Sequence, residues 1–463
     1  MGHESDQRGR GARDHDAVGN GGDHSTDAVQ LQRRRFLAAT ALGGAAIAGG
    51  VGPMLASRPA AAVSTNARII IVGAGAAGLS LATRLARGLD GARITIIDSR
   101  EQHYYQPGLT LVATGAWKPQ RVVDSNARYI DDSVEWLRDS VVDFDPDANR
   151  VHLASGSQRE YDYLLVATGL KVDYAQIEGF EPSLIGTNGI GCVYDNPDHA
   201  ERTWRAISRF IETGGVGVFN RPPGAIKCAG APLKVTMLTE HGLRQAGNRG
   251  KATIEYIQPG RALFSQPDTN DFLLEHFPAR GINVHWEHRL IGIEPGRREA
   301  RLATSDGERT IQYDFLHVPP PMTAPDSVRN SALAAPEGPF TGWLEVDQFT
   351  MQHTRYPNVF GAGDVVGTPI GKTAASVKAQ VPVAAENLIS LIQGRELRAR
   401  YDGYTSCPLI TERGSGILVE FDYDLKMVPS FPFISPYREH WVPWLMKDRM
   451  LHAAYNAMLR GRV

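Results

Sequence analysis

The three cysteines are the residues of this chain best suited to redox chemistry. Cys192 lies in Gly-Ile-Gly-Cys-Val-Tyr, Cys228 in Ala-Ile-Lys-Cys-Ala-Gly-Ala-Pro and Cys407 in Gly-Tyr-Thr-Ser-Cys-Pro-Leu. Two thiols that a fold brings together form a disulfide that accepts two electrons, whereas a cysteine taken alone is more often an inert buried side chain. Three dispersed cysteines suit neither a disulfide framework nor a zinc ribbon. The sequence therefore predicts no metal site, and it leaves a redox pair and inert thiols as alternatives for Cys228 and Cys407.

The composition is that of a globular protein with sizeable cores. The chain has 463 residues, of which 42% are hydrophobic and 22% charged, and this length accommodates two α/β domains. The net charge is −2 and no basic run suggests a nucleic-acid partner, so we expect none.

The N-terminal region has the pattern of an export signal. About 30 polar residues, expected to be disordered, precede Arg33-Arg34-Arg35, an apolar Ala/Gly-rich stretch over 38–55 and the small residues of 59–62. This order resembles a twin-arginine signal, which exports folded proteins with their cofactors. A membrane-anchoring helix is the alternative, disfavoured by the short, glycine-rich stretch. We expect a mature chain from Val63 onward, on the outer face of a bacterial cytoplasmic membrane, where cysteines can stay disulfide-bonded.

A glycine fingerprint for a dinucleotide follows at once. A predicted strand over 67–72 leads into Gly73, Gly75 and Gly78, a helix follows, and a second strand over 93–97 ends in Asp98. The glycines allow a tight turn, a close approach of the pyrophosphate and close packing of helix on strand. The helix N-terminus favours phosphate, and Asp98 is expected to bind the adenosine ribose.

Two further turns identify the expected dinucleotide as FAD. A strand ends in Ala167-Thr168-Gly169, and another ends in Gly363-Asp364. In the flavoproteins with two dinucleotide-binding domains that this chain resembles, the second turn places its aspartate at the ribityl chain and pyrophosphate. We expect Asp364 to do so here.

The second glycine fingerprint of such proteins, which binds a nicotinamide, is missing. The strand 215–219 is followed by Asn220-Arg221-Pro222-Pro223-Gly224. The two prolines lack the N–H groups that would hold a pyrophosphate. Cys228 follows where the next helix is expected to begin, so an NADH dehydrogenase is disfavoured.

Seven segments together resemble sulfide:quinone oxidoreductases of the branch that includes the mitochondrial enzymes. They are 103–107, 115–119, 226–232, 316–322, 356–361, 372–375 and 404–409. The resemblance runs from about residue 69 to the C-terminus.

The resemblance implies that Cys228 and Cys407 are a redox-active disulfide. Hydrosulfide would attack the bridge, leaving a persulfide on Cys407 and a thiolate on Cys228 that faces the flavin. Electrons would pass to FAD and then to membrane quinone, and sulfide or a small thiol would accept the sulfane sulfur. Cys192 is either a third sulfur-handling residue or a structural one, the latter being favoured.

Other candidate residues rest on weaker patterns. Lys372 could place a positive charge near the flavin, with a solvated lysine as the alternative. Four histidines could assist proton movement, although structural histidines are commoner: His103, His199, His241 and His317.

The C-terminal stretch suggests a membrane surface. Aromatic and apolar residues recur at helical spacing, interleaved with basic ones: Trp441, Trp444, Leu445, Leu451, Tyr455, Met458 and Leu459. The stretch is too polar to span a bilayer but suits a helix in the interface. A terminal helix packed on the core or on another subunit is the alternative, which leaves a homo-oligomer open. Phe431 and Phe433 are the candidate walls of a quinone channel.

The expected fold is α/β, with two Rossmann-like domains and an amphipathic C-terminal segment. The expected boundaries are 1–62 for the signal, 66–185 and 336–398 for the FAD domain, 186–335 for the second domain and 399–463 for the C-terminal segment. Two other functions remain open: the flavin subunit of a flavocytochrome c sulfide dehydrogenase, which passes electrons to haem, and a non-catalytic protein that stores or senses sulfane sulfur.

Overall fold

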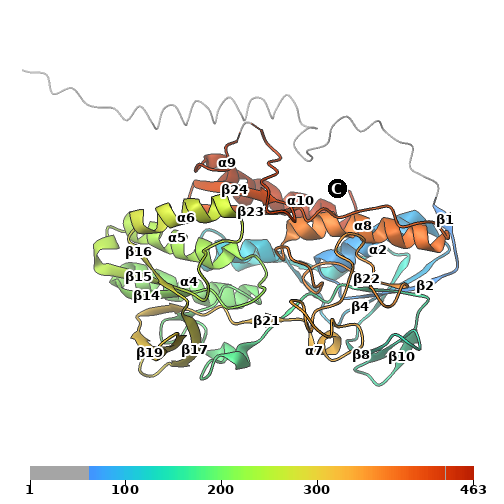
Figure 1. The fold of residues 1–463 in the computed structure, drawn as a ribbon, viewed down its shortest axis with the longest axis horizontal. Coiled ribbons are helices and arrows are strands. Elements are labelled where there is room, and N and C mark those ends of the chain that lie inside the picture. Colours follow the sequence, from blue (N-terminus) through green and yellow to red (C-terminus); the bar gives the residue numbers. More distant parts are fainter. Residues whose placement is uncertain (1–61, 433, 463) are drawn as a thin grey trace, which may run out of the picture. The chain divides into compact units, whose positions relative to one another are not determined.

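Two parallel sheets, each with helices, form the body of the chain (Figure 1). The computed structural model describes residues 62–432 and 434–462. The first sheet has the order β22 (Val359–Gly361), β11 (Tyr163–Val166), β2 (Arg68–Val72), β4 (Arg93–Ile97) and β7 (Val134–Leu137). β2 lies at its centre because its branched residues Ile69 to Val72 are all buried, as is usual for parallel strands covered on both faces.

Helices α2 (Ala76–Gly88) and α8 (Ala374–Ile392) follow two of these strands and pack against each other. A methyl group at Gly88 would come within 2.7 Å of the tip of the Ile389 side chain, so the two helices approach closely here. The Thr373 side chain accepts a hydrogen bond from the Ser376 N–H and caps α8. This cap fixes the start of α8 at Ala374, two residues after Lys372.

The second sheet has the order β13 (Ile190–Gly191), β20 (Phe315–His317), β14 (Gly215–Asn220), β15 (Ala252–Gln258) and β16 (Ile282–Trp286). Its helices are α4 (Pro197–Thr213), α5 (Gly230–Gln245) and α6 (Pro267–Ala279). A short antiparallel pair, β12 (Lys171–Val172) with β21 (Met322–Thr323), connects the two sheets, and β17 (Arg289–Glu294), β18 (Glu299–Thr304) and β19 (Gly307–Gln312) form an antiparallel sheet. The predicted fold class is confirmed, whereas the domain boundaries stay predictions.

The C-terminal segment begins with the hairpin of β23 (Thr405–Glu412) and β24 (Ser415–Phe421). It continues through α9 (Trp441–Leu445), a π-helical turn over Met446–Met450 and α10 (Leu451–Leu459). In Figure 1 these elements are red, and β23 lies along α5 and α8. Within residues 62–432 and 434–462, none of the helices is both long and apolar enough to cross a membrane.

The end of α10 packs on α2 rather than facing outward. Tyr455, Met458 and Leu459 are buried. Ser80 and Thr83 of α2 donate hydrogen bonds to the carbonyls of Met458 and Leu459. For these three residues, the alternative from the sequence analysis holds: they pack on the protein core instead of forming part of a membrane-facing surface. The predicted signal, apart from residue 62, lies outside the described residues.

Candidate functional site

The three predicted dinucleotide motifs meet at the carboxyl ends of the first sheet. Gly73 has a φ of +104°, and a methyl group there would lie 2.5 Å from the carbonyl oxygen of Ala167. A methyl group at Gly78 would lie 1.7 Å from the Gly73 oxygen. At Gly363 a methyl group would come 3.1 Å from Ala77 of α2. The turns thus come close enough to touch, as a shared cofactor site requires.

The beginning of α2 has room and donors for a phosphate group. No atom lies within 4 Å of a methyl group placed at Gly75, and neither an acidic residue nor a side-chain cap occupies the first turn. Asp98, at the end of β4, accepts hydrogen bonds from the N–H groups of Ala74 (2.7 Å) and Arg100 (2.8 Å). The buried hydroxyl of Thr168 has no hydrogen-bond partner among the described residues. An open helix N-terminus and this hydroxyl fit the pyrophosphate and ribityl groups of FAD.

Asp364 and Lys372 lie together beyond this site. The Lys372 ammonium donates to the carbonyls of Asp364 and Val366, each at 2.8 Å, and lies 3.8 Å from the centre of the Trp343 ring. Burial lowers the pKa of Lys372 to about 8. Burial also raises the pKa of Asp364, an effect that Lys227 and Lys372 oppose. The lysine is thus buried and partnered rather than solvated, while its role toward the flavin stays a prediction.

Cys228 lies where the part of the chain that contains the second sheet meets the part that contains the first sheet. Its N–H donates to the carbonyl of Lys372 at 2.8 Å, so the loop before α5 is joined to the loop before α8. Its φ is +50°, a left-handed conformation that is uncommon for a residue with a side chain. α5 begins at Gly230 without a side-chain cap, and a helix N-terminus stabilises a thiolate.

Cys407 comes to the same place from β23. Gly230 makes this possible, because a methyl group there would lie 2.9 Å from the Cys407 sulfur. The ammonium of Lys234, in the first turns of α5, donates to Cys228 Sγ at 3.2 Å and to Cys407 Sγ at 3.3 Å. The structure therefore brings together two cysteines that lie far apart in the sequence. Both are free thiols, and both sulfurs accept a hydrogen bond from the same lysine.

The two thiols share a proton unequally. The hydrogen bond from the Cys407 thiol lowers the pKa of Cys228, and Lys234 lowers it further against the effect of burial. The pKa of Cys407 is raised because its proton is held by the Cys228 sulfur and because the side chain is buried. Burial alone would lower the pKa of Lys234, but the two sulfurs raise it overall. The arrangement suits one thiolate, one thiol and one ammonium.

A second lysine reaches this site from the C-terminal segment. Lys447 is buried in the π-helical turn and donates to the carbonyl of Pro107. Burial and the charge of Lys234 lower the pKa of Lys447 to about 8, although both cysteines oppose this. Asp448 accepts a hydrogen bond from the Trp117 indole at 2.6 Å. Two of the quoted sequence segments, 103–107 and 115–119, therefore hold the C-terminal segment in place.

The sequence interpretation missed both lysines. Lys234 had a signal, since it is the only charged residue between Cys228 and Thr239, in a part of α5 that is buried from Gly230 onward. Lys447 had none, because it stands in a segment with several other basic residues.

Other predicted residues lie apart from the thiol pair. Cys192 follows β13, is fully buried, and burial raises the pKa of its thiol to about 12. No described hydrogen bond joins it to Cys228 or Cys407, and its predicted role is untested. Phe431 is half-buried, whereas Phe433 lies outside the described residues.

Each of the four candidate histidines contacts another group of the protein. His103 is hydrogen-bonded to Asn126 and to Tyr455 of α10. His317 accepts from the Val193 N–H, His199 lies 3.5 Å from Asp195 and His241 lies 3.4 Å from Glu412.

Comparisons with known proteins agree with this architecture. Residues 67–209 match the family model described as pyridine nucleotide-disulphide oxidoreductase. The chain is 38% identical over 397 residues to the mitochondrial sulfide:quinone oxidoreductase of Mus musculus, covering 85% of this chain and 86% of that protein. It is 36% identical, over the same shares of both chains, to the mitochondrial sulfide:quinone oxidoreductase of Dictyostelium discoideum. The solved sulfide:quinone oxidoreductase of Aquifex aeolicus has the same fold, with a TM-score of 0.69, 21% identity and coverage of 85% of this chain and 92% of that one.

Proposed function

Because the chain belongs to the sulfide:quinone oxidoreductase family, we propose that Cys228 and Cys407 are the pair that reacts with sulfide. The chain is an FAD-dependent enzyme of this family, with sulfide as electron donor and quinone as electron acceptor. One observation supports the assignment of the pair above all: both sulfurs accept hydrogen bonds from the buried ammonium of Lys234.

In the proposed reaction, the two cysteines begin as a disulfide. Hydrosulfide attacks the Cys407 sulfur, a new S–S bond forms there, and the Cys407–Cys228 bond breaks. Cys407 then carries a persulfide and Cys228 leaves as a thiolate. A leaving thiol of low pKa departs faster, so the lowered pKa of Cys228 supports this division of roles.

The chain's own groups stabilise the leaving thiolate. Lys234 donates to the Cys228 sulfur, and the N-terminus of α5 follows directly. Sulfide or a small thiol attacks the outer sulfur of the persulfide and carries it away as sulfane sulfur, which leaves both cysteines reduced. Re-formation of the disulfide releases two electrons, which FAD, when bound, would accept and pass to quinone.

Anaerobic titration of the FAD-loaded protein with sulfide tests this proposal. Sulfide should bleach the flavin, and a short-chain quinone should restore its absorbance. Cys228→Ser and Cys407→Ser should each abolish the bleaching while FAD stays bound. Unchanged bleaching in both variants would refute the role of the pair. Recovery with cytochrome c but not with quinone would instead favour the haem-linked alternative, which the relatives do not favour.

We also propose that the enzyme works at a membrane surface after twin-arginine export. Trp441, Trp444 and Leu445 are only half-buried, which supports an interfacial role for α9. Trp444→Ser with Leu445→Ser should weaken co-sedimentation with anionic lipid vesicles. Phe349→Ser, at an apolar residue that is 40% exposed elsewhere, is the matched control. Equal binding of both variants would exclude α9 as the docking surface.

Export can be tested separately. The proposal rests on Arg33-Arg34-Arg35 before the apolar stretch. A fusion of residues 1–65 to a folded reporter should reach the outer side of the cytoplasmic membrane, and replacement of all three arginines by lysine should retain it inside. Export of the lysine variant at the wild-type level would contradict the twin-arginine route.

A further inference from the structure

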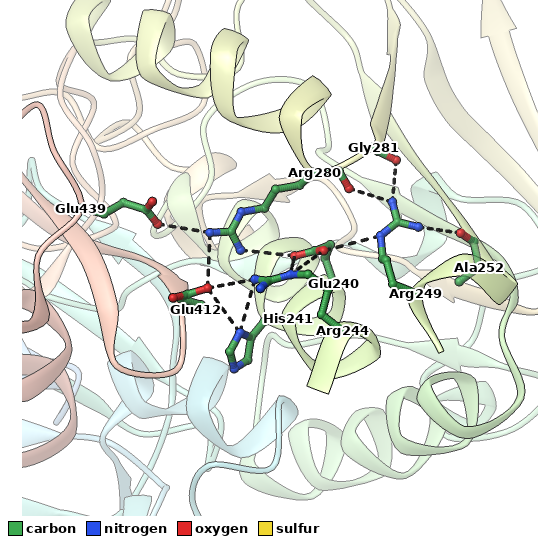
Figure 2. A network of polar contacts seen from close by, with 9 residues as sticks. All are labelled: Glu240, His241, Arg244, Arg249, Ala252, Arg280, Gly281, Glu412 and Glu439. Atoms are coloured by element: carbon green, nitrogen blue, oxygen red, sulfur yellow. Dashed lines mark hydrogen bonds and ion pairs between the residues drawn. The ribbon is translucent and has the colours of Figure 1, made fainter. Parts of the chain in front are cut away.

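A cluster of arginines and carboxylates joins three parts of the chain near the C-terminal end of α5, away from the thiol pair at its N-terminal end. The arginine–glutamate cluster consists of Glu240, His241, Arg244, Arg249, Arg280, Glu412 and Glu439, and Figure 2 shows its contacts. Glu240 is only 1% exposed. A carboxylate so deeply buried requires partners, because desolvation of an unpaired charge is costly.

The cluster connects the two elements that carry the cysteines. Glu240 and Arg244 belong to α5, which begins after Cys228, and Glu412 ends β23, which contains Cys407. Arg244 joins them directly, with its guanidinium 2.9 Å from Glu240 and 2.9 Å from Glu412. α5 is therefore attached to β23 at two places, at the sulfurs and at the cluster.

Arg280 contacts all three carboxylates of the cluster at once (Figure 2). It follows α6, and its guanidinium lies 3.2 Å from Glu240, 3.4 Å from Glu412 and 3.3 Å from Glu439. Its side chain is 14% exposed, and its carbonyl accepts a hydrogen bond from Arg249 at 2.8 Å. Arg280 thus links α5, β23 and the residues before α9 to the end of α6 beside the second sheet.

This second attachment limits how α5 can move relative to β23. From Gly230 to Glu240, α5 is about 15 Å long. At the near end, Gly230 leaves no room for a side chain against Cys407. A small rotation of α5 about this contact moves Cys228 relative to Cys407, and the cluster at the far end resists such a rotation.

From these contacts, and resting on the proposed role of the two cysteines, we propose that Arg280 is a positioning residue that holds Cys228 and Cys407 at disulfide-bonding distance by fixing α5 against β23. It acts through Glu240 and Glu412 and touches neither sulfur. Through its ion pair with Glu439, Arg280 also connects the residues before α9 to α5 and β23.

An Arg280→Gln variant should still fold. Glu240 keeps Arg244 at 2.9 Å and Arg249 at 3.5 Å, so the buried carboxylate is not left unpaired. Glu412 keeps Arg244 as well. What the variant loses is the link among three separate elements.

The test is the equilibrium between dithiol and disulfide in the FAD-loaded protein, measured in glutathione buffers. The exchange consumes one oxidised glutathione and releases two reduced glutathiones for each disulfide formed. Arg280→Gln should lower the equilibrium constant for disulfide formation about tenfold, because misplaced thiols have a lower effective concentration. Arg280→Lys keeps the charge but loses the fork of donors, and it should recover part of the loss.

Arg249→Gln is the matched control, since Arg249 contacts Glu240 but neither Glu412 nor Glu439 among the described contacts. It should leave the equilibrium constant within about twofold of the wild type. An equal effect of both glutamine variants would overturn the proposal, because the cause would then be charge loss at Glu240. So would a wild-type constant in Arg280→Gln.

Failure of Arg280→Gln to fold would be answered by Glu412→Gln, which weakens the ion pairs of both Arg280 and Arg244 with β23 while keeping the side-chain shape. A wild-type equilibrium constant in that variant would overturn the proposal as well. If the wild-type protein itself formed no disulfide, the proposed role of the cysteines would fail instead, so the two failures are distinguishable.

Discussion

Lys234 is the residue on which the chemistry of the thiol pair depends most directly. Its buried ammonium, 1% exposed, contacts both sulfurs and is the nearest compensating charge for a thiolate. In a low-dielectric surrounding such a contact stabilises the thiolate far more than it would in water. Lys447 adds a second positive charge, held by the carbonyl of Pro107.

A Lys234→Met variant should raise the pKa of the more acidic thiol by about one unit or more. The thiolate is the reactive form, so alkylation of the reduced protein by iodoacetamide should need a correspondingly higher pH. The rate of alkylation between pH 5 and 10 measures this shift. Lys378→Met, at an exposed lysine of α8, should leave the profile unchanged. An unchanged profile in Lys234→Met would show that the helix N-terminus suffices.

At the scale of elements, the loop between β2 and α2 has glycine at Gly75 and Gly78 for two different reasons. Gly78 is required by the protein itself, since a methyl group there would lie 1.7 Å from the Gly73 carbonyl. Gly75 has an extended conformation that any residue adopts, with φ of −81° and ψ of −165°. The space around Gly75 is open, so only a bound phosphate group needs it.

Alanine substitutions should separate these needs. Gly78→Ala should disrupt the loop and lower thermal stability. Gly75→Ala should keep the wild-type circular dichroism and melting temperature of the FAD-free protein but lower its FAD content. The measurement is flavin absorbance released per chain on denaturation, beside thermal melts of the FAD-free proteins. Full FAD content in Gly75→Ala would contradict the placement of the pyrophosphate at α2.

At the scale of the whole molecule, buried histidines make stability sensitive to acid. His317 is fully buried at the end of β20, and burial lowers its pKa to about 3. In the unfolded chain the same group has a pKa of about 6.5. As the pH falls below 6.5 the unfolded chain takes up the proton first, so the free energy of unfolding decreases down to about pH 3.

For His317 alone, this linkage should lower the free energy of unfolding by about 2 kcal/mol between pH 8 and pH 5. Urea unfolding across this range measures the slope. In His317→Gln, which keeps an acceptor for the Val193 N–H, the slope should be smaller by that amount whatever the absolute stability. Equal slopes in the two proteins would show that this histidine is not buried in the neutral form.

Local patterns carried most of the fold prediction. The glycines of 73–78 and the run Arg68-Ile-Ile-Ile-Val predict strand, turn and helix because each depends on a few neighbouring residues. The apolar residues at the end of the chain were harder to interpret. Helical spacing is the same for a helix in a membrane interface and for one packed on a protein, and here Tyr455, Met458 and Leu459 pack on the protein.

The sequence by itself determined that this chain has a dinucleotide-binding α/β fold, and it predicted that Cys228 lies where a nicotinamide site would otherwise begin. Motif spacing suffices for such conclusions because it reflects local backbone geometry. Only the tertiary structure decided which charges surround the sulfurs. Lys234 comes from α5, Cys407 from β23 and Lys447 from the last turns of the chain. No local rule links residues so far apart, because their meeting depends on how complete elements pack.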